Sequence, residues 1–167
     1  VGAWESGKFI GVVLFGRGAS PQLGKPYRLG QDECVELVRI ALTKHENAVS
    51  RITAFAIKFL HNVNPKLRLI VSFADQSQGH HGGIYQAGNW IYTGKGTAKP
   101  RLIMPDGTTR HNRLYQGVNK AEIPQGAYWS KPEGKHRYLM PLDADMRERI
   151  LPLSKPYPKR AKQAMAG

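Results

Sequence analysis

The chain has 167 residues, which fits one domain with or without a short tail. Lys and Arg number 25 against 12 Asp and Glu, giving a net charge of +13. No apolar run approaches the ~20 residues of a membrane-spanning helix, so no membrane partner is expected. Cys34 is the single cysteine, which excludes an internal disulfide and favours a reducing compartment such as the cytoplasm.

The positive charge is concentrated in the second part of the chain. Residues 95–167 hold 15 Lys and Arg against six Asp and Glu, whereas residues 1–94 hold ten against six. Nucleic acid is the simplest partner for such a field, because release of counterions from phosphates drives binding. The alternative is a basic protein that has no polyanionic partner.

The N-terminal residues predict a hairpin followed by a loop. Residues 3–15 are rich in β-forming side chains on both sides of a turn at residues 5–8. Residues 17–31 are rich in Gly and Pro, which indicates a surface or lid loop.

A strand, a helix and a second strand follow. Residues 35–43 are predicted as a strand, with Val35, Leu37 and Arg39 on one face and the intervening residues on the other. Residues 47–61 predict a helix capped by Asn47 or Ser50. Residues 67–73 are apolar enough for a strand buried on both faces. This order predicts a right-handed crossover between parallel strands.

The remaining pattern predicts shorter elements. A short helix over 82–88 precedes a strand at 89–93, and residues 100–116 read as a hairpin. Residues 136–142 predict another strand, after which Asp143 can cap a short helix. We therefore expect a folded domain over residues 1–151 and an extended basic tail over 152–167.

The stretch SFADQSQGHHGGIYQAGNWIY, residues 72–92, crowds polar and titratable side chains after an apolar strand. Asp75 follows that strand directly, where it can be a general base, a metal ligand or simply a turn residue. His80 could join Asp75 in a metal site, although no HExxH or CxxC pattern supports one. Tyr85 could contact an extruded base, whereas Trp90 is expected to pack in the core.

The start of the predicted helix offers a second candidate site. Free backbone N–H groups near Asn47 and Ser50 can bind an anion, although ordinary capping explains the same residues. Ser50 can be a cap, a phosphate ligand or a catalytic hydroxyl, and no GxSxG motif surrounds it.

A third set of side chains could follow a nucleic-acid backbone or simply form a solvated basic surface. Its members are Lys135, His136, Arg137, Tyr157, Lys159 and Arg160.

Four strings carry a resemblance to a known family: DECVELVRIALTKHENAVSR, LRLIVSFADQSQGHHGGIYQAGNWIYTG, KHRYLMPLD and LSKPYPKR. Over roughly residues 9–159 the chain resembles the Mom proteins of phages, which are similar to GNAT acyltransferases. The resemblance implies an α/β (α+β) fold with a mixed twisted sheet and a central β-α-β unit that binds acyl-CoA. It also implies conversion of adenine in double-stranded DNA to N6-(carbamoylmethyl)adenine, which shields phage DNA from restriction in the host cytoplasm.

The resemblance also implies a donor, a metal and site residues. The donor would be of the acetyl-CoA type, and iron has been proposed as a requirement. By motif, the catalytic positions fall on Arg39, Ser50, Asp75 and Tyr85, with His80 and Asn89 as further candidates near the DNA. Donor contacts would come from the splayed strand and the helix start, through Val38, Ile40, Leu42, Asn47 and Ser50.

One departure keeps other functions open. GNAT enzymes usually carry a Gly-rich loop before the CoA helix, whereas residues 43–50 read TKHENAVS without glycine. A conventional N-acetyltransferase acting on a small amine or protein is therefore one alternative. A non-enzymatic nucleic-acid-binding protein is the other.

Overall fold

The computed structural model describes residues 1–18, 21–75, 82–96, 100–110, 112–115, 122–131 and 134–158. They form two compact units, one of residues 1–94 and 136–167 and the other of residues 95–135. We call the first the core unit and the second the insertion, because it interrupts the core unit. The predicted boundary at residue 151 stays a prediction.

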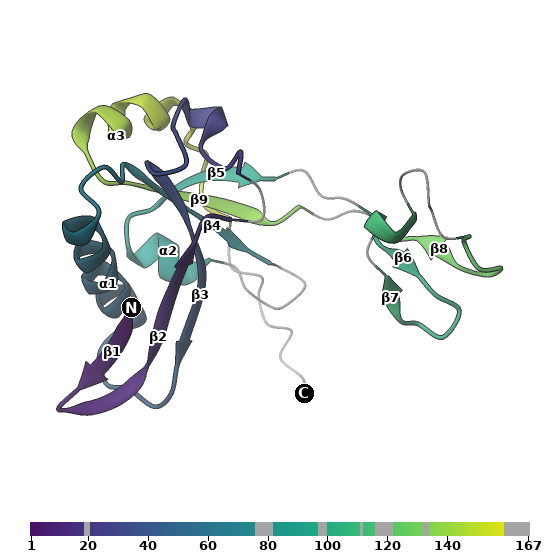
Figure 1. Cartoon of the computed structure of the whole chain (residues 1–167), viewed down its shortest axis with the longest axis horizontal. Helices are drawn as coiled ribbons and strands as arrows, with labels where there is room; N and C mark the ends of the chain where they lie inside the picture. Colours follow the sequence, from purple (N-terminus) through teal and green to yellow (C-terminus); the bar gives the residue numbers. More distant parts are fainter. Residues whose placement is uncertain are drawn as a thin grey trace. The chain divides into compact units, whose positions relative to one another are not determined.

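The core unit is built on one mixed sheet of six strands in the order β1-β2-β3-β4-β9-β5 (Figure 1). Strands β3 and β4 are parallel, whereas β1–β2, β2–β3 and β4–β9 are antiparallel. This mixture confirms the expected α+β class. The strand bounds are β1 (Gly2–Glu5), β2 (Lys8–Gly16), β3 (Cys34–Leu42), β4 (Leu69–Ala74), β5 (Ile91–Lys95) and β9 (His136–Pro141).

The predicted N-terminal hairpin is confirmed. Glu5 pairs with Lys8 across a two-residue turn, and both turn residues, Ser6 and Gly7, have positive φ values of 48° and 77°. Such a turn matches the right-handed twist of the two strands that it joins.

The central strand–helix–strand unit is also confirmed. Helix α1 (Val49–Val63) joins β3 to its parallel neighbour β4. The predicted cap is wrong, because Ala48 occupies the N-cap position and no side chain there accepts a hydrogen bond.

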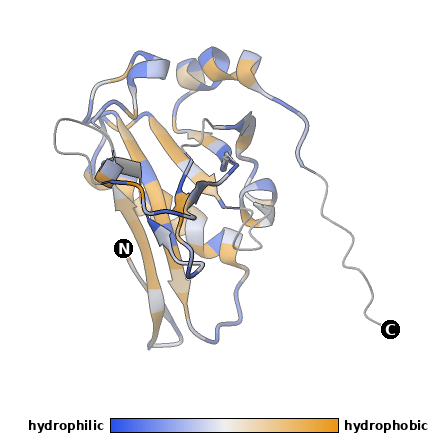
Figure 2. Ribbon diagram, turned by 90° about the vertical axis from the view of Figure 1, so that its right-hand side faces the viewer, coloured by the Kyte–Doolittle hydropathy of each residue, from blue (hydrophilic) through white to orange (hydrophobic). Residues whose placement is uncertain are grey.

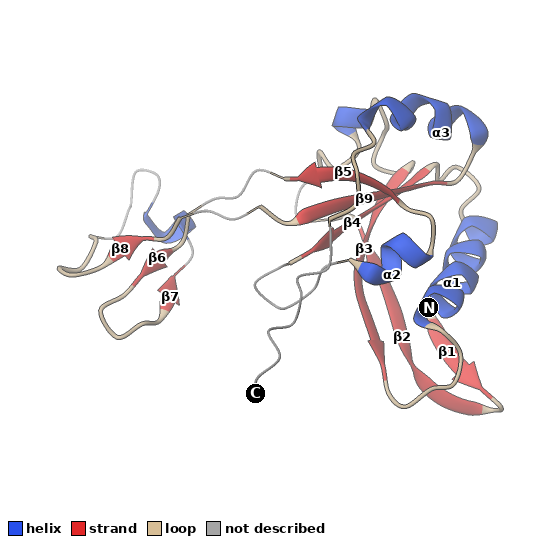
Figure 3. Cartoon of the chain, turned by 180° about the vertical axis from the view of Figure 1, so that it is seen from behind, coloured by secondary structure: helices blue, strands red, loops and turns tan. Residues whose placement is uncertain are grey.

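The strands of the core unit are rich in hydrophobic residues, as their hydropathy colouring shows (Figure 2), and apolar clusters pack on both faces of the sheet. On one face Ile70 of β4 packs with Ala56 and Ile57 of α1. On the other face Leu69 packs with Met146 of α3 (Ala144–Ile150). Figure 3 shows α1 and α2 (Gly83–Ala87) apart from α3. Burial on both faces therefore explains why β4 is a continuous apolar run.

Alternation along β3 breaks at Val38, which corrects the predicted faces of this strand. Leu14 of β2 pairs with Arg39, but the next residue, Phe15, pairs with Leu37, so Val38 is an extra residue. Such a bulge changes which side chains share a face. Ile40 consequently packs on the same cluster as Leu37.

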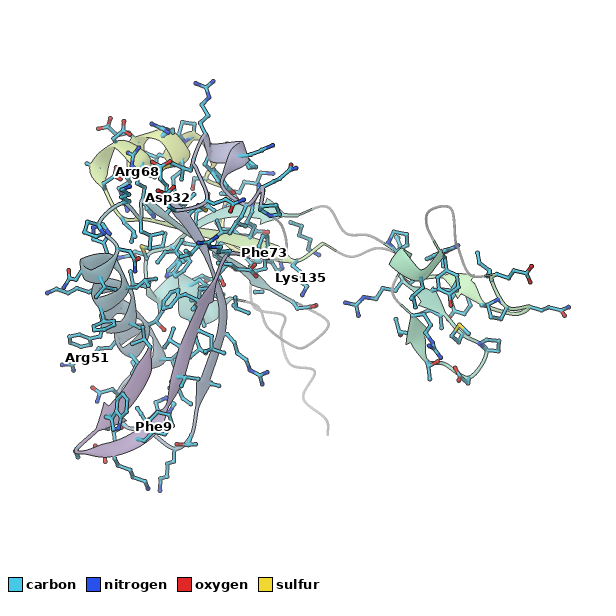
Figure 4. All side chains as sticks on the ribbon, viewed as in Figure 1. Phe9, Asp32, Arg51, Arg68, Phe73 and Lys135 are labelled. Atoms are coloured by element: carbon cyan, nitrogen blue, oxygen red, sulfur yellow. The ribbon has the colours of Figure 1, made fainter. Side chains whose placement is uncertain are left out.

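The helix after β9 starts as predicted. The carboxylate of Asp143 accepts a hydrogen bond from the Met146 N–H at 2.7 Å and binds Arg68 through two further bonds at 2.8 and 2.9 Å. Figure 4 labels Arg68 beside α3. The guanidinium holds the pKa of Asp143 at about 2. The 3₁₀ turn η4 (Leu151–Leu153) follows α3.

Part of the predicted tail packs on the sheet. The N–H of Lys155 donates to the carbonyl of Tyr92 at 2.8 Å, and the hydroxyl of Tyr157 donates to the carbonyl of Trp90. At least up to Tyr157, these residues extend along β5.

The insertion contains a small sheet in the order β7-β6-β8, made of β6 (Leu102–Ile103), β7 (Thr109–Arg110) and β8 (Tyr128–Trp129). β6 and β7 are antiparallel, which confirms the hairpin predicted within 100–116. The ends of the insertion lie together, because the Gly96 N–H donates to the Lys135 carbonyl at 2.9 Å. Two further 3₁₀ turns are η1 (Lys25–Tyr27) in the core unit and η3 (Asn112–Tyr115) in the insertion.

Candidate functional site

The candidate site lies where β3 and β4 stop pairing. Their parallel register runs from Cys34 opposite Leu69 to Leu37 opposite Ser72. Beyond this point β3 continues along β2 to Leu42, whereas β4 continues along β9 to Ala74. The Val38 bulge sits at the same level of β3. The two parallel strands therefore have separate neighbours beyond Leu37 and Ser72.

A chain of hydroxyl groups marks this point. Ser72 Oγ lies 2.8 Å from the Leu37 carbonyl oxygen and 2.7 Å from the Tyr85 hydroxyl. A carbonyl only accepts, so the single proton of Ser72 goes to Leu37 and the Tyr85 phenol donates to Ser72. The Tyr85 hydroxyl is thereby fixed beside the last parallel pair.

Aromatic packing holds the ring of Tyr85 in place. It stacks on Tyr138 with ring centroids 4.8 Å apart and meets Trp90 edge-on at 5.1 Å. Tyr138 in turn lies against Gly82, where a Cβ would come within 2.2 Å of its hydroxyl. Gly82 also has a φ of 77°, so glycine is required there on two grounds.

Burial determines the protonation state of Tyr85. Desolvation raises the pKa of its phenol above the ordinary value of 10.0, and this effect outweighs the opposing effect of the hydrogen bond between Tyr85 and Ser72. Tyr85 is therefore a neutral hydrogen-bond donor near neutral pH and is unsuited to act as a base.

Ser50 and Tyr85 are brought to the same small cavity. The cavity has a volume of about 30 Å³ and lies between the first turns of α1 and helix α2. Thr53, Ile57 and Trp90 contribute to its lining. This is room for about one water molecule. The two predicted residues thus share a wall although 34 positions separate them in the sequence.

Asp75 and Arg39 lie beyond the last parallel pair. Asp75 directly follows β4 and is partly exposed, and Arg39 lies two residues after Leu37 and is exposed. Because β3 and β4 run parallel, both residues belong to the same end of the sheet as Tyr85. Of the residues predicted to contact the donor, Ile40 packs against the core and Leu42 is partly buried, whereas Val38 is 56 % exposed.

The anion site expected near Asn47 holds a carboxylate of the protein itself. Glu5 accepts hydrogen bonds from the backbone N–H groups of Glu46 and Asn47, both at 2.8 Å, and from the Asn47 side chain at 2.7 Å. These bonds lower the pKa of Glu5. Of the backbone N–H groups in this region, those of Glu46 and Asn47 are therefore already used.

A larger groove lies on the other side of α1. It has a volume of about 580 Å³ and runs between the β1–β2 hairpin and the helix. Its walls include Trp4, Ile52, Phe55 and Phe59. Because different side chains of α1 line the two spaces, the helix separates this apolar groove from the Tyr85 cavity.

The predicted nucleic-acid contacts fall in different environments. His136 is only 2 % exposed and hydrogen-bonds Tyr92 at 2.7 Å, so its ring lies in the interior rather than where a phosphate could reach it. Arg137 Nε donates to Thr93 Oγ1 at 2.8 Å, and Tyr157 packs near Tyr92. Lys135 is exposed.

The remaining predicted site residues are Asn89, His80, Lys159 and Arg160. Asn89 is exposed and adopts a left-handed φ of 57° between α2 and β5, a conformation that Asn tolerates well. His80, Lys159 and Arg160 lie outside the described residues. In the described part of the chain no group of three or more His, Cys, Asp or Glu side chains could hold a metal ion.

Ser72 and Glu5 were not predicted as site residues. Ser72 is fully buried in the otherwise apolar run LIVSFA, and a lone hydroxyl in such a strand is a signal that sequence reasoning can use. Glu5 gave no comparable signal, because its partners lie about 40 residues further along the chain.

Comparison with known proteins identifies the family. The model of the Mom protein family matches residues 1–159. The chain belongs to this family. It is 25 % identical over 174 residues to the protein named methylcarbamoylase mom of Escherichia phage Mu, covering 95 % of this chain and 71 % of that protein. Ser72 of β4 and Tyr85 of α2, whose hydroxyl groups are bonded to each other, both lie in the string of residues 67–94 that carries the resemblance to this family. Among its described helices, none is long and apolar enough to cross a membrane.

Proposed function

We propose that the chain is a phage DNA-modification enzyme that transfers a carbamoylmethyl group to N6 of adenine in double-stranded DNA. Membership of the Mom family carries this proposal, supported by the Tyr85 site at the strand divergence. The net charge of +13 suits a DNA substrate. The product would shield DNA from restriction in the host cytoplasm.

The chemistry asks for a proton acceptor and for groups that orient the donor. In the transfer, a bond forms between adenine N6 and the methylene carbon of a donor of the form X–CH2–C(=O)NH2, and the bond from that carbon to the leaving group X breaks. Acetyl-CoA has no leaving group on its methyl carbon, so it is not itself the donor of this step. The N6 proton passes to the Asp75 carboxylate, and the electron pair departs with the leaving group. The Tyr85 hydroxyl gives its single proton to Ser72, so at the reacting groups its oxygen accepts a hydrogen bond from the carbamoyl N–H of the donor. Ser50 and Arg39 orient the donor.

Access to N6 requires the adenine to leave the helix stack. An enzyme that acts on a base in duplex DNA extrudes that base into a pocket. The described Tyr85 cavity holds about 30 Å³, which is too small for an adenine. We therefore propose that the base enters from the Asp75 end of the sheet, beyond β4, rather than through this cavity.

Acetyl-CoA fits the site only in part. The divergence of β3 and β4 suits an acyl chain lying between two strands that no longer pair. A pyrophosphate does not fit at residues 46–47, because the Glu5 carboxylate already holds both N–H groups there and would repel a second anion. Iron would draw on Asp75 and His80, of which only Asp75 is described. The roles proposed above therefore belong to the chain's own side chains.

The test is to express the chain in bacteria and analyse the nucleosides of their DNA by mass spectrometry. A carbamoylmethyl-deoxyadenosine peak, lost in Asp75→Asn, would support the proposal. Asp32→Asn is the matched control, because Asp32 is an exposed carboxylate that precedes β3, at the opposite end of the parallel strands from Asp75.

Three results would contradict the proposal. DNA that stays unmodified in cells containing soluble, folded protein would refute it as stated. Acetyl-CoA turnover with small amines in the absence of DNA would favour a conventional N-acetyltransferase. Salt-dependent DNA binding, without any modified nucleoside, would favour a non-enzymatic binding protein.

A further inference from the structure

The small sheet of the insertion has two faces of different character. Residues that pair directly across antiparallel strands share a face. Leu102 pairs with Arg110 and with Trp129, and Ile103 pairs with Thr109 and with Tyr128. The two sets therefore lie on opposite faces of the sheet.

The face that carries Leu102 is the packed one. Leu102 is completely buried, and the ring of Trp129, although 41 % exposed, meets Tyr115 edge-on with centroids 6.1 Å apart. The Tyr115 hydroxyl also lies 4.0 Å from the sulfur of Met104. This face supplies the internal packing of the insertion.

The opposite face presents an exposed tyrosine next to a cation. Tyr128 is 63 % exposed. The pairing continues one step beyond Trp129, because the Ser130 N–H donates to the Arg101 carbonyl at 2.8 Å and Ser130 Oγ accepts from the Arg101 N–H at 2.9 Å. Arg101, two residues from Ile103, therefore lies on the same face as Tyr128 and is itself exposed. We call this the Tyr128 face; it consists of Arg101, Ile103, Thr109, Tyr128 and Ser130.

The insertion is more strongly charged than the core unit. Its 41 residues hold eight Lys and Arg against three Asp and Glu, whereas the other 126 residues hold 17 against nine. The excess per residue is about twice as high in the insertion. The insertion has short strands, an exposed aromatic ring and excess positive charge. None of these features stabilises a hydrophobic core, so they call for another explanation.

We propose that the Tyr128 face of the insertion is a DNA-binding surface, on which Arg101 contacts a phosphate and Tyr128 packs on a sugar or stacks on an extruded base. The positive charge of the insertion favours DNA as the partner, because DNA releases bound counterions when it binds a basic surface. An exposed aromatic ring beside a cation is the combination that nucleic-acid-binding sheets present to bases. This inference rests on the proposed function and adds to it the element that holds the substrate.

The test compares single variants of the full chain by fluorescence anisotropy with a short fluorescein-labelled DNA duplex over a range of salt concentrations. We expect Tyr128→Ala to weaken binding roughly tenfold, the usual loss for a stacked aromatic ring. Tyr128→Phe should keep most of the affinity. Arg101→Gln should lower the slope of log affinity against log salt by about one phosphate contact.

Matched controls lie in the core unit. Phe55→Ala removes an aromatic ring of α1 that is also 63 % exposed, and Arg147→Gln removes an exposed Arg of α3. Both should bind DNA as the parent does. Unchanged binding by Tyr128→Ala and Arg101→Gln would overturn the inference, as would equal losses in the controls.

The outcomes separate this inference from the proposed function. If cells with the parent chain contain modified adenine but Tyr128→Ala and Arg101→Gln bind DNA unchanged, only the inference fails. If the variants lose affinity as expected while no modified nucleoside forms, the DNA-binding surface stands and the proposed reaction fails. A parent chain that prefers single-stranded RNA to duplex DNA would overturn the assignment of the partner.

Discussion

The core unit and the insertion differ in how much of their apolar surface is buried. The core unit has strands of up to nine residues and apolar clusters on both faces of its sheet. The insertion has strands of two residues, and Leu102 is the one large hydrophobic side chain that is fully buried among its described residues. A sheet with so little burial contributes little to the stability of the chain. We infer that buried side chains stabilise the core unit, whereas the insertion serves the protein through its exposed side chains.

The largest expected effect is the difference in unfolding free energy between a buried Leu→Ala substitution in the core unit and one in the insertion. Leu69→Ala, at a fully buried position in β4, should lower the free energy of unfolding of the core unit by about 2–5 kcal/mol. Leu102→Ala, equally buried, should leave the main transition in urea almost unchanged, because it loosens only the insertion. Equal shifts of the main transition would show that the two units unfold together.

Removal of the insertion should affect binding more than folding. Gly96 and Lys135 are hydrogen-bonded neighbours, so a two-glycine link can replace residues 97–133 without moving β5 or β9. We expect the thermal transition of the core unit to persist and the affinity for duplex DNA to fall on the order of a hundredfold. A chain that fails to fold after this excision would break the comparison. A matched replacement of the loop at residues 106–107 controls for shortening as such.

Two tyrosines test the role of the hydroxyl at the site. Tyr85→Phe removes the donor to Ser72 and should cost about 1 kcal/mol of stability and most of the activity. Tyr27→Phe is the control, because the buried Tyr27 hydroxyl has no hydrogen-bond partner among the described residues. Its removal should be neutral or slightly stabilising by urea denaturation. Equal activity in both variants would remove Tyr85 from the site.

The smallest expected effect is on acid stability. The folded-state pKa of Asp143 is lowered from 3.8 to about 2 by its hydrogen bonds with Arg68, so its stabilisation is complete above pH 3.8 and lost as the pH falls through 2. We expect less than about 1 kcal/mol, because the Asp143 side chain is 37 % exposed and the solvent screens the pair.

The acid response should distinguish the two units. Asp143→Asn should flatten the pH dependence of core-unit unfolding between pH 4 and 2, as followed by circular dichroism. Asp106, whose pKa is lowered by its bonds with Thr108 in the insertion, is the matched carboxylate. Asp106→Asn should leave the core-unit profile unchanged, and an equal flattening would argue that the insertion stabilises the core unit.

Local patterns were sufficient to predict most of the fold. The apolar stripe of α1 and the unbroken apolar run of β4 each reflect burial that the neighbouring sequence shows directly. The turn at Ser6 and Gly7 and the cap at Asp143 are equally local. The alternation along β3 failed because the Val38 bulge depends on pairing with β2, which no short pattern records.

The site was predicted in part, and for a similar reason. The positions of Ser50 and Tyr85 came from the family motifs, and the structure places both at one cavity. Ser72 and Glu5 were missed, because their importance arises from partners 13 and about 40 residues away. The insertion was also missed as a unit, since its closing contact joins Gly96 to Lys135 across the whole segment.

The position of β9 also has a consequence for the synthesis of the protein. β9 lies between β4 and β5 in the sheet, although it follows both in the chain. Tyr138 of β9 supplies the ring on which Tyr85 stacks. A ribosome therefore has to deliver the strand up to Pro141 before the earlier-made α2 can take its final position. Until β9 is synthesised, Tyr85 lacks the ring of Tyr138 on which it stacks. A chain that terminates before β9 therefore cannot form the candidate site.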